Sequence, residues 1–443
     1  MRKWVLMALI FVLLLGVVPF HVEAGIIYET RKGDTLYKIG EVYGARPNAI
    51  AEYNGMPEQR KLVEGQALIL PGDVYHVRPG DTLHHLAMIH QTTVQKLVDV
   101  NGLQGRVIRP GQSLQIPQPK KDEVWTGAYF YPKDKAYNQE MIRSLGKYLS
   151  SIFTFSYKPS SDGKLTYIDL NGANKEAWNQ GIYPYATVTN LSAEGFDPDL
   201  AHTLMSEPTR SVFIENIYRM LDELDYFGVV IDFEGIHPED RQLYNTFVEE
   251  LSERLDVGKM RLALAVPPMQ GATVPSYNAA YDYKTLGEHA DYLFLMTYDW
   301  HWPGGPSGPI APIQEVKKTL DFATSVVNRQ KLILGIPMYA YDWVVSDSNK
   351  VTAKAYSVQN AITTYIKNES TIHYDGEAEA PWFRYKDSEG RTHEVWFEDP
   401  RSLVAKFELV RDYDLGGMGA WQLDFSLKQS ESILEESFNV RRK

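Results

Sequence analysis

The chain has 443 residues, a formal net charge of −12 and no cysteine. The lack of cysteine excludes disulfides, thiol nucleophiles and cysteine-ligated zinc, and the negative charge argues against a non-specific nucleic-acid partner. Hydrophobic residues at 44% and charged residues at 23% are typical of a globular protein, and the length allows several domains.

The first 24 residues have the pattern of a secretory signal peptide. Arg2 and Lys3 precede an unbroken apolar run over residues 4–20, and the small residues around Ala24 offer a cleavage point. The run is only slightly short for a membrane span, so an uncleaved anchor is the alternative. In either case we expect the rest of the chain to work outside the cytoplasm, with no membrane contact once the signal is removed.

An internal repeat follows, over residues 26–71 and 73–117. The opening Gly-Asp-Thr-Leu, the central Asn-Gly and the closing Gly-Gln…Pro of the first copy all recur 46 or 47 positions later. Each copy begins and ends in a strand-like segment and holds two short helical patterns between them, the first starting at an Asp-Thr cap. The sequence therefore predicts two small βααβ modules.

Each repeat resembles a LysM domain over its whole length. The resemblance implies binding of N-acetylglucosamine-containing polymers such as peptidoglycan and chitin, in a shallow groove between the first and last loops. Two tandem copies fit avidity on a repeating polymer. The alternative is that the same residues serve only as turn and cap. The expected groove residues are Gly33, Asp34 and Thr35 in the first copy and Gly80, Asp81 and Thr82 in the second.

A linker-like stretch over residues 118–124 leads into a long domain, residues 125–443. Short apolar runs alternate there with helical patterns, which predicts an α/β fold, a (β/α)8 TIM barrel with its active site at the carboxyl ends of the strands. The expected strands are residues 125–131, 152–157, 183–188, 229–234, 261–266, 292–297, 332–337 and 417–423.

Two further features of this domain are predicted. The helix before the fourth strand should be capped by Thr209 and turn Val212, Ile217 and Leu221, with Met220 and Leu224, toward the core. The segment between the seventh and eighth strands, about residues 341–414, is too long for a loop and one helix. It predicts a small inserted α+β subdomain, whose final helix begins after the N-cap and N1 pair Asp399-Pro400.

The fourth strand carries the most informative pattern. Because side chains two apart on a strand share a face, Val230, Asp232 and Glu234 should point into the barrel, while Val229, Ile231 and Phe233 pack outward. Two carboxyls close together in an apolar setting are unfavourable, so one should have a raised pKa, as a general acid near neutral pH requires. The alternative is a strand that runs into solvent with two ordinary acids.

Aromatic and polar side chains end several other strands. They are Tyr129 and Tyr131, Met296, Tyr298 and Asp299, Tyr339 and Tyr341, and Trp421. Each aromatic alone is more often a core residue, but several at one barrel rim around a few acids are typical of a sugar-binding cleft. The sequence contains no phosphate loop, nucleophile elbow or HExxH spacing, so we expect no cofactor and no metal.

The long domain resembles family 18 of the glycoside hydrolases. That family's Asp-Gly-x-Asp-x-Asp-x-Glu signature aligns with residues 227–234, where Asp232 and Glu234 match and Phe227 and Val230 replace the first two aspartates. The sixth-strand Met-x-Tyr-Asp and the eighth-strand tryptophan also match. The bacterial branch that joins LysM repeats to this barrel, the spore cortex-lytic N-acetylglucosaminidases and their secreted relatives, is the most similar, and the segment 393–399 has its appearance as well.

The resemblance implies a role for each matching residue. Glu234 would protonate the leaving oxygen and then activate water, Asp232 would orient and stabilise the 2-acetamido group, and Tyr298 would bind its oxygen. Asp299, Trp421, Met296, Tyr129 and Tyr339 would bind substrate. With Val230 below it, Asp232 lacks the acidic neighbour found in chitinases, so its titration should be simpler.

These inferences lead to one expected function and two alternatives. We expect a monomeric peptidoglycan N-acetylglucosaminidase, secreted or spore-associated, that acts by substrate-assisted retaining hydrolysis and is anchored to cell wall or cortex by its LysM repeats. The alternatives are a chitinase or chitooligosaccharide hydrolase, and a carbohydrate-binding protein with weak or no catalysis.

Overall fold

The structure is a computed structural model that describes residues 26–56, 61–71, 74–77, 80–89, 93–117, 121–271, 278–345, 353–425 and 427–442. The predicted signal peptide lies outside the described residues, as do residues 118–120 of the linker. Within the described residues, no helix has the length and apolar character needed to cross a membrane.

Each N-terminal repeat folds as a βααβ module. The first consists of β1 (Ile26–Glu29), α1 (Leu36–Tyr43), α2 (Pro47–Tyr53) and β2 (Ala67–Leu70), and the second of β3 (Val74–His76), α3 (Leu83–Ile89), α4 (Val94–Val100) and β4 (Ser113–Gln115). In both modules the two strands pair antiparallel. The Thr35 side chain accepts a hydrogen bond from the Lys38 N–H and so caps α1, as predicted.

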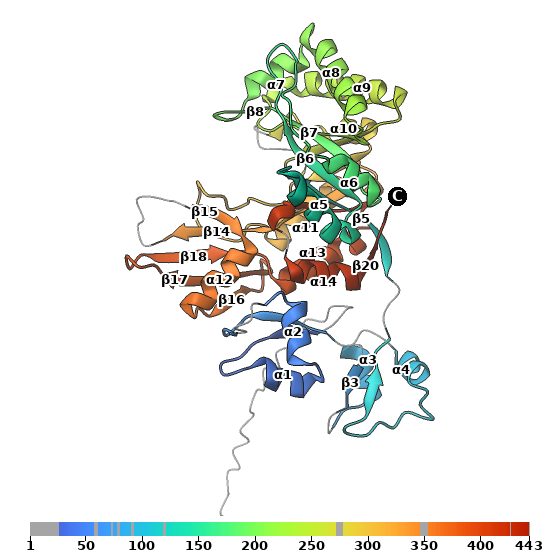
Figure 1. Ribbon diagram of the computed structural model, residues 1–443, viewed down its shortest axis with the longest axis vertical. Helices are drawn as coiled ribbons and strands as arrows, with labels where there is room; N and C mark the ends of the chain where they lie inside the picture. Colours follow the sequence, from blue (N-terminus) through green and yellow to red (C-terminus); the bar gives the residue numbers. More distant parts are fainter. Residues whose placement is uncertain are drawn as a thin grey trace, which may run out of the picture.

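Eight parallel strands close into a barrel (Figure 1), which confirms the predicted fold. Strand β19 pairs with both β13 and β5, and this closes the sheet; the short β20 (Phe438–Val440) adds to the outer end of β5. The barrel strands are β5 (Asp122–Phe130), β6 (Ser151–Tyr157), β7 (Tyr183–Thr189), β10 (Gly228–Asp232), β11 (Arg261–Val266), β12 (Tyr292–Leu295), β13 (Leu332–Pro337) and β19 (Gly417–Trp421).

Helices surround the barrel because alternate strand residues face outward and are apolar. Val229, Ile231 and Phe233 of the β10 segment pack into this outer layer, whereas Val230 lies in the aromatic cluster that fills the barrel, as the alternation predicted. The surrounding helices are α5 (Lys135–Leu145), α6 (Ala173–Asn179), α7 (Pro198–Met205), α8 (Thr209–Glu223), α9 (Arg241–Val257), α10 (Tyr283–His289), α11 (Ile313–Val326), α13 (Pro400–Asp412) and α14 (Lys428–Ser437).

The predicted start of α8 was wrong by one residue. Thr209 is the first helical residue, and the position before it is Pro208, whose side chain makes no capping hydrogen bond. Val212, which was expected in the core, is 49% exposed, and Phe213 is buried in its place, in register with Ile217 and Leu221.

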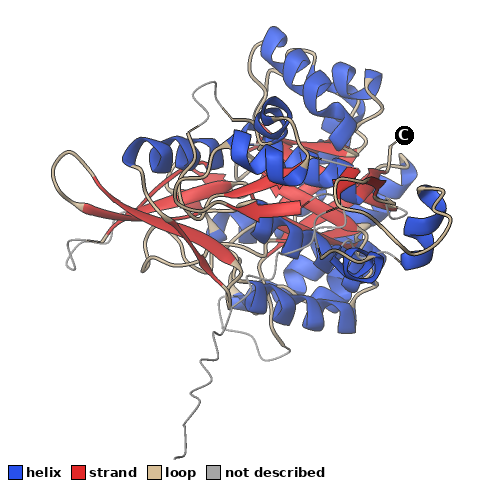
Figure 2. Cartoon of the chain, turned by 90° about the horizontal axis from the view of Figure 1, so that it is seen from below, coloured by secondary structure: helices blue, strands red, loops and turns tan. Residues whose placement is uncertain are grey.

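The insertion between the seventh and eighth barrel strands is an antiparallel sheet with one helix. Its order is β15-β14-β18-β17-β16, and it projects to one side of the barrel (Figures 1 and 2). Asp399 caps the following helix α13 in a capping box with Pro400 at its start, as predicted. The elements of the insertion are β14 (Tyr339–Val344), β15 (Ala353–Ser357), α12 (Val358–Asn368), β16 (Ile372–Asp375), β17 (Ala380–Lys386) and β18 (Thr392–Trp396).

Candidate active site

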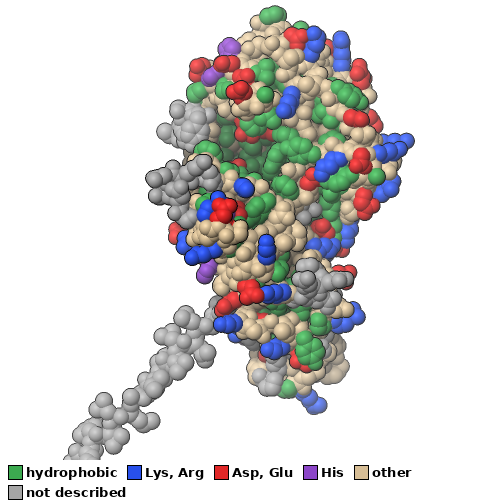
Figure 3. Space-filling view, turned by 60° about the vertical axis from the view of Figure 1, so that its left-hand side comes forward, with side chains coloured by type: hydrophobic (Ala, Val, Ile, Leu, Met, Phe, Trp, Pro, Cys, Tyr) green, Lys and Arg blue, Asp and Glu red, His purple; other side chains and the backbone are tan. Residues whose placement is uncertain are grey.

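A hollow of about 930 Å³ opens at the carboxyl ends of the barrel strands. The eight residues for which the sequence predicts a catalytic or substrate-binding role all line it, although they come from five separate segments of the chain. Figure 3 shows a depression in this part of the surface, with hydrophobic side chains around it and acidic atoms inside it. The eight residues are Tyr129, Asp232, Glu234, Met296, Tyr298, Asp299, Tyr339 and Trp421.

Asp232 is the last residue of β10 and is only 3% exposed. Its Oδ1 atom has no hydrogen-bond partner, and burial raises the pKa of its carboxyl. Burial is also the main cause of the raised pKa of Glu234, two residues further on, and the nearby Asp232 and Asp299 add to this rise. The structure thus raises both pKa values where the sequence predicted one, because the two acids share an apolar cleft.

Glu234 is held by a residue that the sequence analysis missed. Asn190, fully buried after the end of β7, accepts a hydrogen bond from the Glu234 N–H at 2.9 Å and donates one to the Glu234 carbonyl at 2.8 Å. The Tyr281 hydroxyl donates to the neighbouring Phe233 carbonyl at 2.8 Å. The only signal for Asn190 in the sequence is an amide two residues after the end of the predicted third strand.

Asp299 is fixed by two tyrosines from the inserted subdomain. The hydroxyls of Tyr339 and Tyr341 both donate to Asp299 Oδ1, at 2.5 and 2.8 Å. Burial raises the pKa of Asp299, and these two hydrogen bonds act against that rise. The backbone of Asp299 is left-handed, with φ 62°, which aims its side chain into the cleft beside Tyr298.

A second hollow, of about 1480 Å³, meets the first at Glu234. It shares Met296, Tyr298 and Asp299 with the first hollow and adds Trp300 and Trp302, which sequence reasoning did not place in the site. Trp302 is 56% exposed, and its ring lies so close to Gly304 that a Cβ there would be 2.0 Å from it. Glu234 therefore lies where the two hollows meet.

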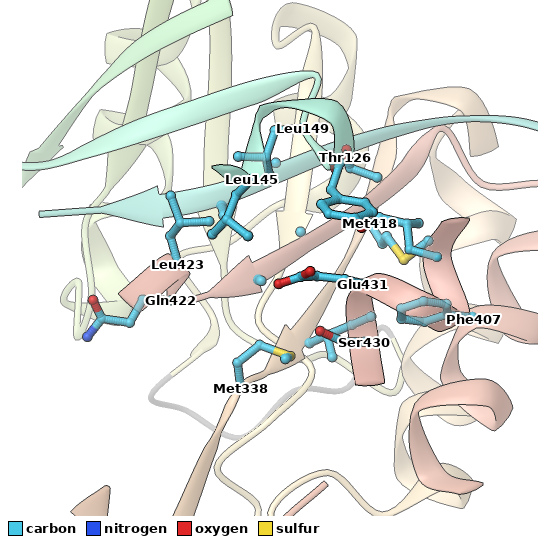
Figure 4. Close-up of a pocket in the computed structure, with 17 residues that line it drawn as sticks. Thr126, Leu145, Leu149, Met338, Phe407, Met418, Gln422, Leu423, Ser430 and Glu431 are labelled. Carbon is cyan, nitrogen blue, oxygen red and sulfur yellow. Dashed lines mark hydrogen bonds between the residues drawn. The ribbon is translucent and has the colours of Figure 1, made fainter. Parts of the chain in front are cut away.

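A third cavity, of about 610 Å³, lies on the outer side of the barrel (Figure 4). It separates β5 and β19 from α5, α13 and α14, and Leu145, Phe407 and Met418 are among its mainly apolar lining residues. None of the acids of the cleft lines it.

Comparison with known proteins identifies both parts of the chain. Residues 129–425 match the family profile of the glycosyl hydrolases family 18, and residues 28–71 and 75–117 match that of the LysM domain. The chain belongs to glycosyl hydrolase family 18. It is a glycoside hydrolase with two LysM domains, and its partner is an N-acetylglucosamine-containing polymer.

Three relatives cover nearly all of this family 18 chain. It is 36% identical over 413 residues to the glycosylase YdhD of Bacillus subtilis (strain 168), a match that covers 93% of this chain and 98% of that protein. It is 33% identical over 427 residues to the cortical fragment-lytic enzyme of the same strain, with 94% and 99% covered. The crystal structure of the Bacillus cereus spore cortex-lytic enzyme SleL superposes with a TM-score of 0.81 at 32% identity, with 94% and 99% covered.

The two departures from the family 18 signature have a structural explanation. Phe227 packs against the tilted ring of Tyr183, with ring centroids 4.2 Å apart, and against Tyr185 at the end of the barrel opposite the cleft. Val230 lies beside Thr187 in the aromatic cluster inside the barrel. Both positions belong to an apolar filling, and burial in this setting raises the pKa of Asp232.

The expected LysM groove residues have structural partners. The carboxylate of Asp34 accepts hydrogen bonds from the Tyr28 hydroxyl and the Arg31 N–H, both at 2.7 Å, and Asp81 accepts one from Tyr75 at 2.9 Å. The turn-and-cap interpretation therefore holds for these acids. Gly33 and Gly80, with φ +86° and +95°, face open space at the same loops, which leaves both loops accessible.

Proposed function

We propose that this protein is a peptidoglycan hydrolase that cuts after N-acetylglucosamine by substrate-assisted, retaining hydrolysis. The observation that carries the proposal is the buried, unpaired Oδ1 of Asp232 two residues from Glu234, whose pKa is raised. The names of the relatives support the same proposal, since one is a cortical fragment-lytic enzyme and another is a spore cortex-lytic enzyme. We therefore place the enzyme outside the cytoplasm, at the cell wall or spore.

In the first step Glu234 protonates the glycosidic oxygen, which leaves. The carbonyl oxygen of the substrate's own 2-acetamido group attacks the anomeric carbon, so no second carboxylate is needed as a nucleophile. The free Oδ1 of Asp232 accepts the acetamido N–H. As positive charge develops on that nitrogen, it favours the ionised form of Asp232, which then stabilises the intermediate.

In the second step Glu234, now ionised, takes a proton from water, which opens the cyclic intermediate from the same face that the leaving group occupied. The Tyr298 hydroxyl, buried against Asp232 and Asp299, is placed to bind the acetamido oxygen. Trp421 forms the floor under the sugar, packed against Tyr129 with ring centroids 4.9 Å apart. Two displacements at the anomeric carbon give net retention.

The charge of the cleft supports N-acetylglucosamine as the sugar whose glycosidic bond is cut. Taken together, the described residues that line the two hollows include three carboxyls and no lysine or arginine. Such a cleft disfavours the lactyl-peptide arm of muramic acid, which carries carboxylates. The muramic lactam of spore cortex is neutral but has no free acetamido oxygen to act as a nucleophile, so it fits only beyond the cleaved bond.

Product analysis tests this proposal. Purified spore cortex is digested, the new reducing ends are reduced with borohydride, and the labelled sugar is identified. We expect glucosaminitol, whereas muramitol would show a muramidase and overturn the proposed pocket.

A chitooligosaccharide hydrolase is the second candidate, because every sugar of chitin carries the acetamido group that the Asp232 site requires. Soluble chitooligosaccharides are run beside cortex fragments in the same assay. A higher kcat/KM on chitin would make it the substrate.

A further inference from the structure

The first LysM domain is built into the body of the hydrolase. The inner face of its β1–β2 sheet packs on its own helices through Leu36, Leu68 and Leu70. The outer face of the same sheet joins the hydrophobic core of the barrel domain, through Ile27 and Ile69, which are 4% and 1% exposed. Figure 1 shows this domain directly below α13 and α14. Its sheet is therefore covered on both faces, one of them by the hydrolase.

The last strand of the second LysM domain has polar outer residues instead. Ser113 and Gln115 occupy the β4 positions that correspond to Ala67 and Ile69 in β2, and both are exposed. The hydrophobic core of this domain consists of its own residues. In Figure 1, α3 and α4 lie to the side, away from the barrel. The two repeats thus share a fold but differ in polarity and exposure at these two positions.

Polar contacts lock the first LysM domain in place. Arg401, buried at the start of α13, pairs with Glu29 at 2.7 Å and with Asp399 at 2.6 Å, and donates to the Gly65 carbonyl at 3.2 Å. The Gln429 side chain of α14 donates to Asn54 Oδ1 at 2.8 Å. Buried polar groups with complete hydrogen bonding fix one orientation between two packed surfaces.

The inserted sheet connects this docked domain to the catalytic cleft. At one edge, β14 and β15 supply Tyr339, Tyr341 and Ala355 to the cleft. At the opposite edge, the N–H of Ile372 in β16 donates to the Glu64 carbonyl at 2.9 Å. The next residue in the last loop of the LysM domain is Gly65. Only glycine fits this contact, because a Cβ there would lie 2.0 Å from the Ile372 carbonyl oxygen.

We propose that the first LysM domain is a fixed guide that holds a glycan strand in a set position relative to the cleft, while the second domain serves only to retain the enzyme on the wall. The inference rests on the proposed function, since it requires a polymeric glycan as substrate. A guide adds nothing for a short soluble fragment, which reaches the cleft by diffusion. Undocking the guide should therefore slow cleavage of polymer alone.

The test converts the docked face into the exposed one. The double substitution Ala67→Ser with Ile69→Gln gives the first domain the serine and glutamine that the second domain has at the same positions. The second repeat shows that the LysM fold tolerates these residues. The matched control is Ser113→Ala with Gln115→Ala, on the exposed face of β4. Hydrogen exchange of β1 and β2 in the full chain reports whether the docking is lost.

We expect the undocked variant to digest insoluble peptidoglycan roughly tenfold more slowly, a small part of the gain that linking two sites can give. Its kcat/KM on soluble cortex fragments and its retention on the polymer should stay at the wild-type level, and the control should match wild type throughout. An unchanged polymer rate in a variant with released β1 and β2, or an equal loss on both substrates, would overturn the guide. If the double variant does not fold, Gln429→Ala takes its place with the same expected outcomes. Wild-type enzyme without activity on soluble fragments would instead refute the proposed function.

Discussion

Replacement of Asn190 by alanine should disable the catalytic acid without touching it. Asn190 makes two hydrogen bonds to the backbone of Glu234 and a third to the Asp197 carbonyl, at 2.9, 2.8 and 2.9 Å. The substitution leaves the N–H and C=O of Glu234 without these partners in a partly buried place. Each unsatisfied buried group costs about 1–3 kcal/mol.

The backbone can relieve that cost only by moving toward water, which carries the Glu234 carboxyl with it. A displacement of about 1 Å at a reacting group costs on the order of a hundredfold in rate. We therefore expect kcat of Asn190→Ala on soluble cortex fragments to fall by about that factor, with little change in KM, because the residues that bind the sugar keep their places.

Asn138 provides the matched control. It is also fully buried, accepts from the Lys133 N–H at 2.8 Å and donates to the Lys133 and Leu170 carbonyls at 3.3 and 3.1 Å, but it holds a residue that does not line the cleft. Asn138→Ala should lower the Tm by a similar amount and leave kcat unchanged. Wild-type kcat in a folded Asn190→Ala variant, or equal kcat losses in the two variants, would refute the reasoning.

Three further predictions concern the cleft. Glu234→Gln should lower kcat by about 10²–10⁴ and leave polymer binding intact, because the amide cannot donate the proton; residual activity above about a hundredth of wild type would exclude Glu234 as the acid. On the alkaline side, the kcat/KM of wild type should fall when pH rises through the raised pKa of Glu234. Burial is the main cause of that raised pKa, and the charge of Asp232 adds to it. Asp232→Asn removes that charge and should move the alkaline limb of its residual activity to lower pH; a limb that stays in place would contradict this coupling. Gly304→Ala should displace the Trp302 ring and raise KM for long oligosaccharides with kcat unchanged; an unchanged KM would remove Trp302 from the substrate path.

The sequence by itself determined the barrel and the residues around its cleft. Because successive side chains of a strand point to opposite faces, a strand that packs Ile231 against the outer helices must point Asp232 into the barrel. Parallel strands also bring their carboxyl ends to one rim. Strand identity was therefore enough to gather Glu234, Tyr298 and Trp421 in one place. The start of α8 at Thr209 was misjudged because a threonine before an apolar run fits both a cap and a first helical residue, and only the backbone decides between them.

The tertiary structure alone decided how the acids are held and how the domains are joined. Asn190 reaches Glu234 across 44 positions, and Arg401 reaches Glu29 across 372, so no local pattern reports either contact. The docking of the first LysM domain did leave a trace in the sequence, since Ile69 stands where the second repeat has Gln115. An apolar side chain on the outer face of a two-stranded sheet must be covered by something, but which surface covers it depends on the whole fold.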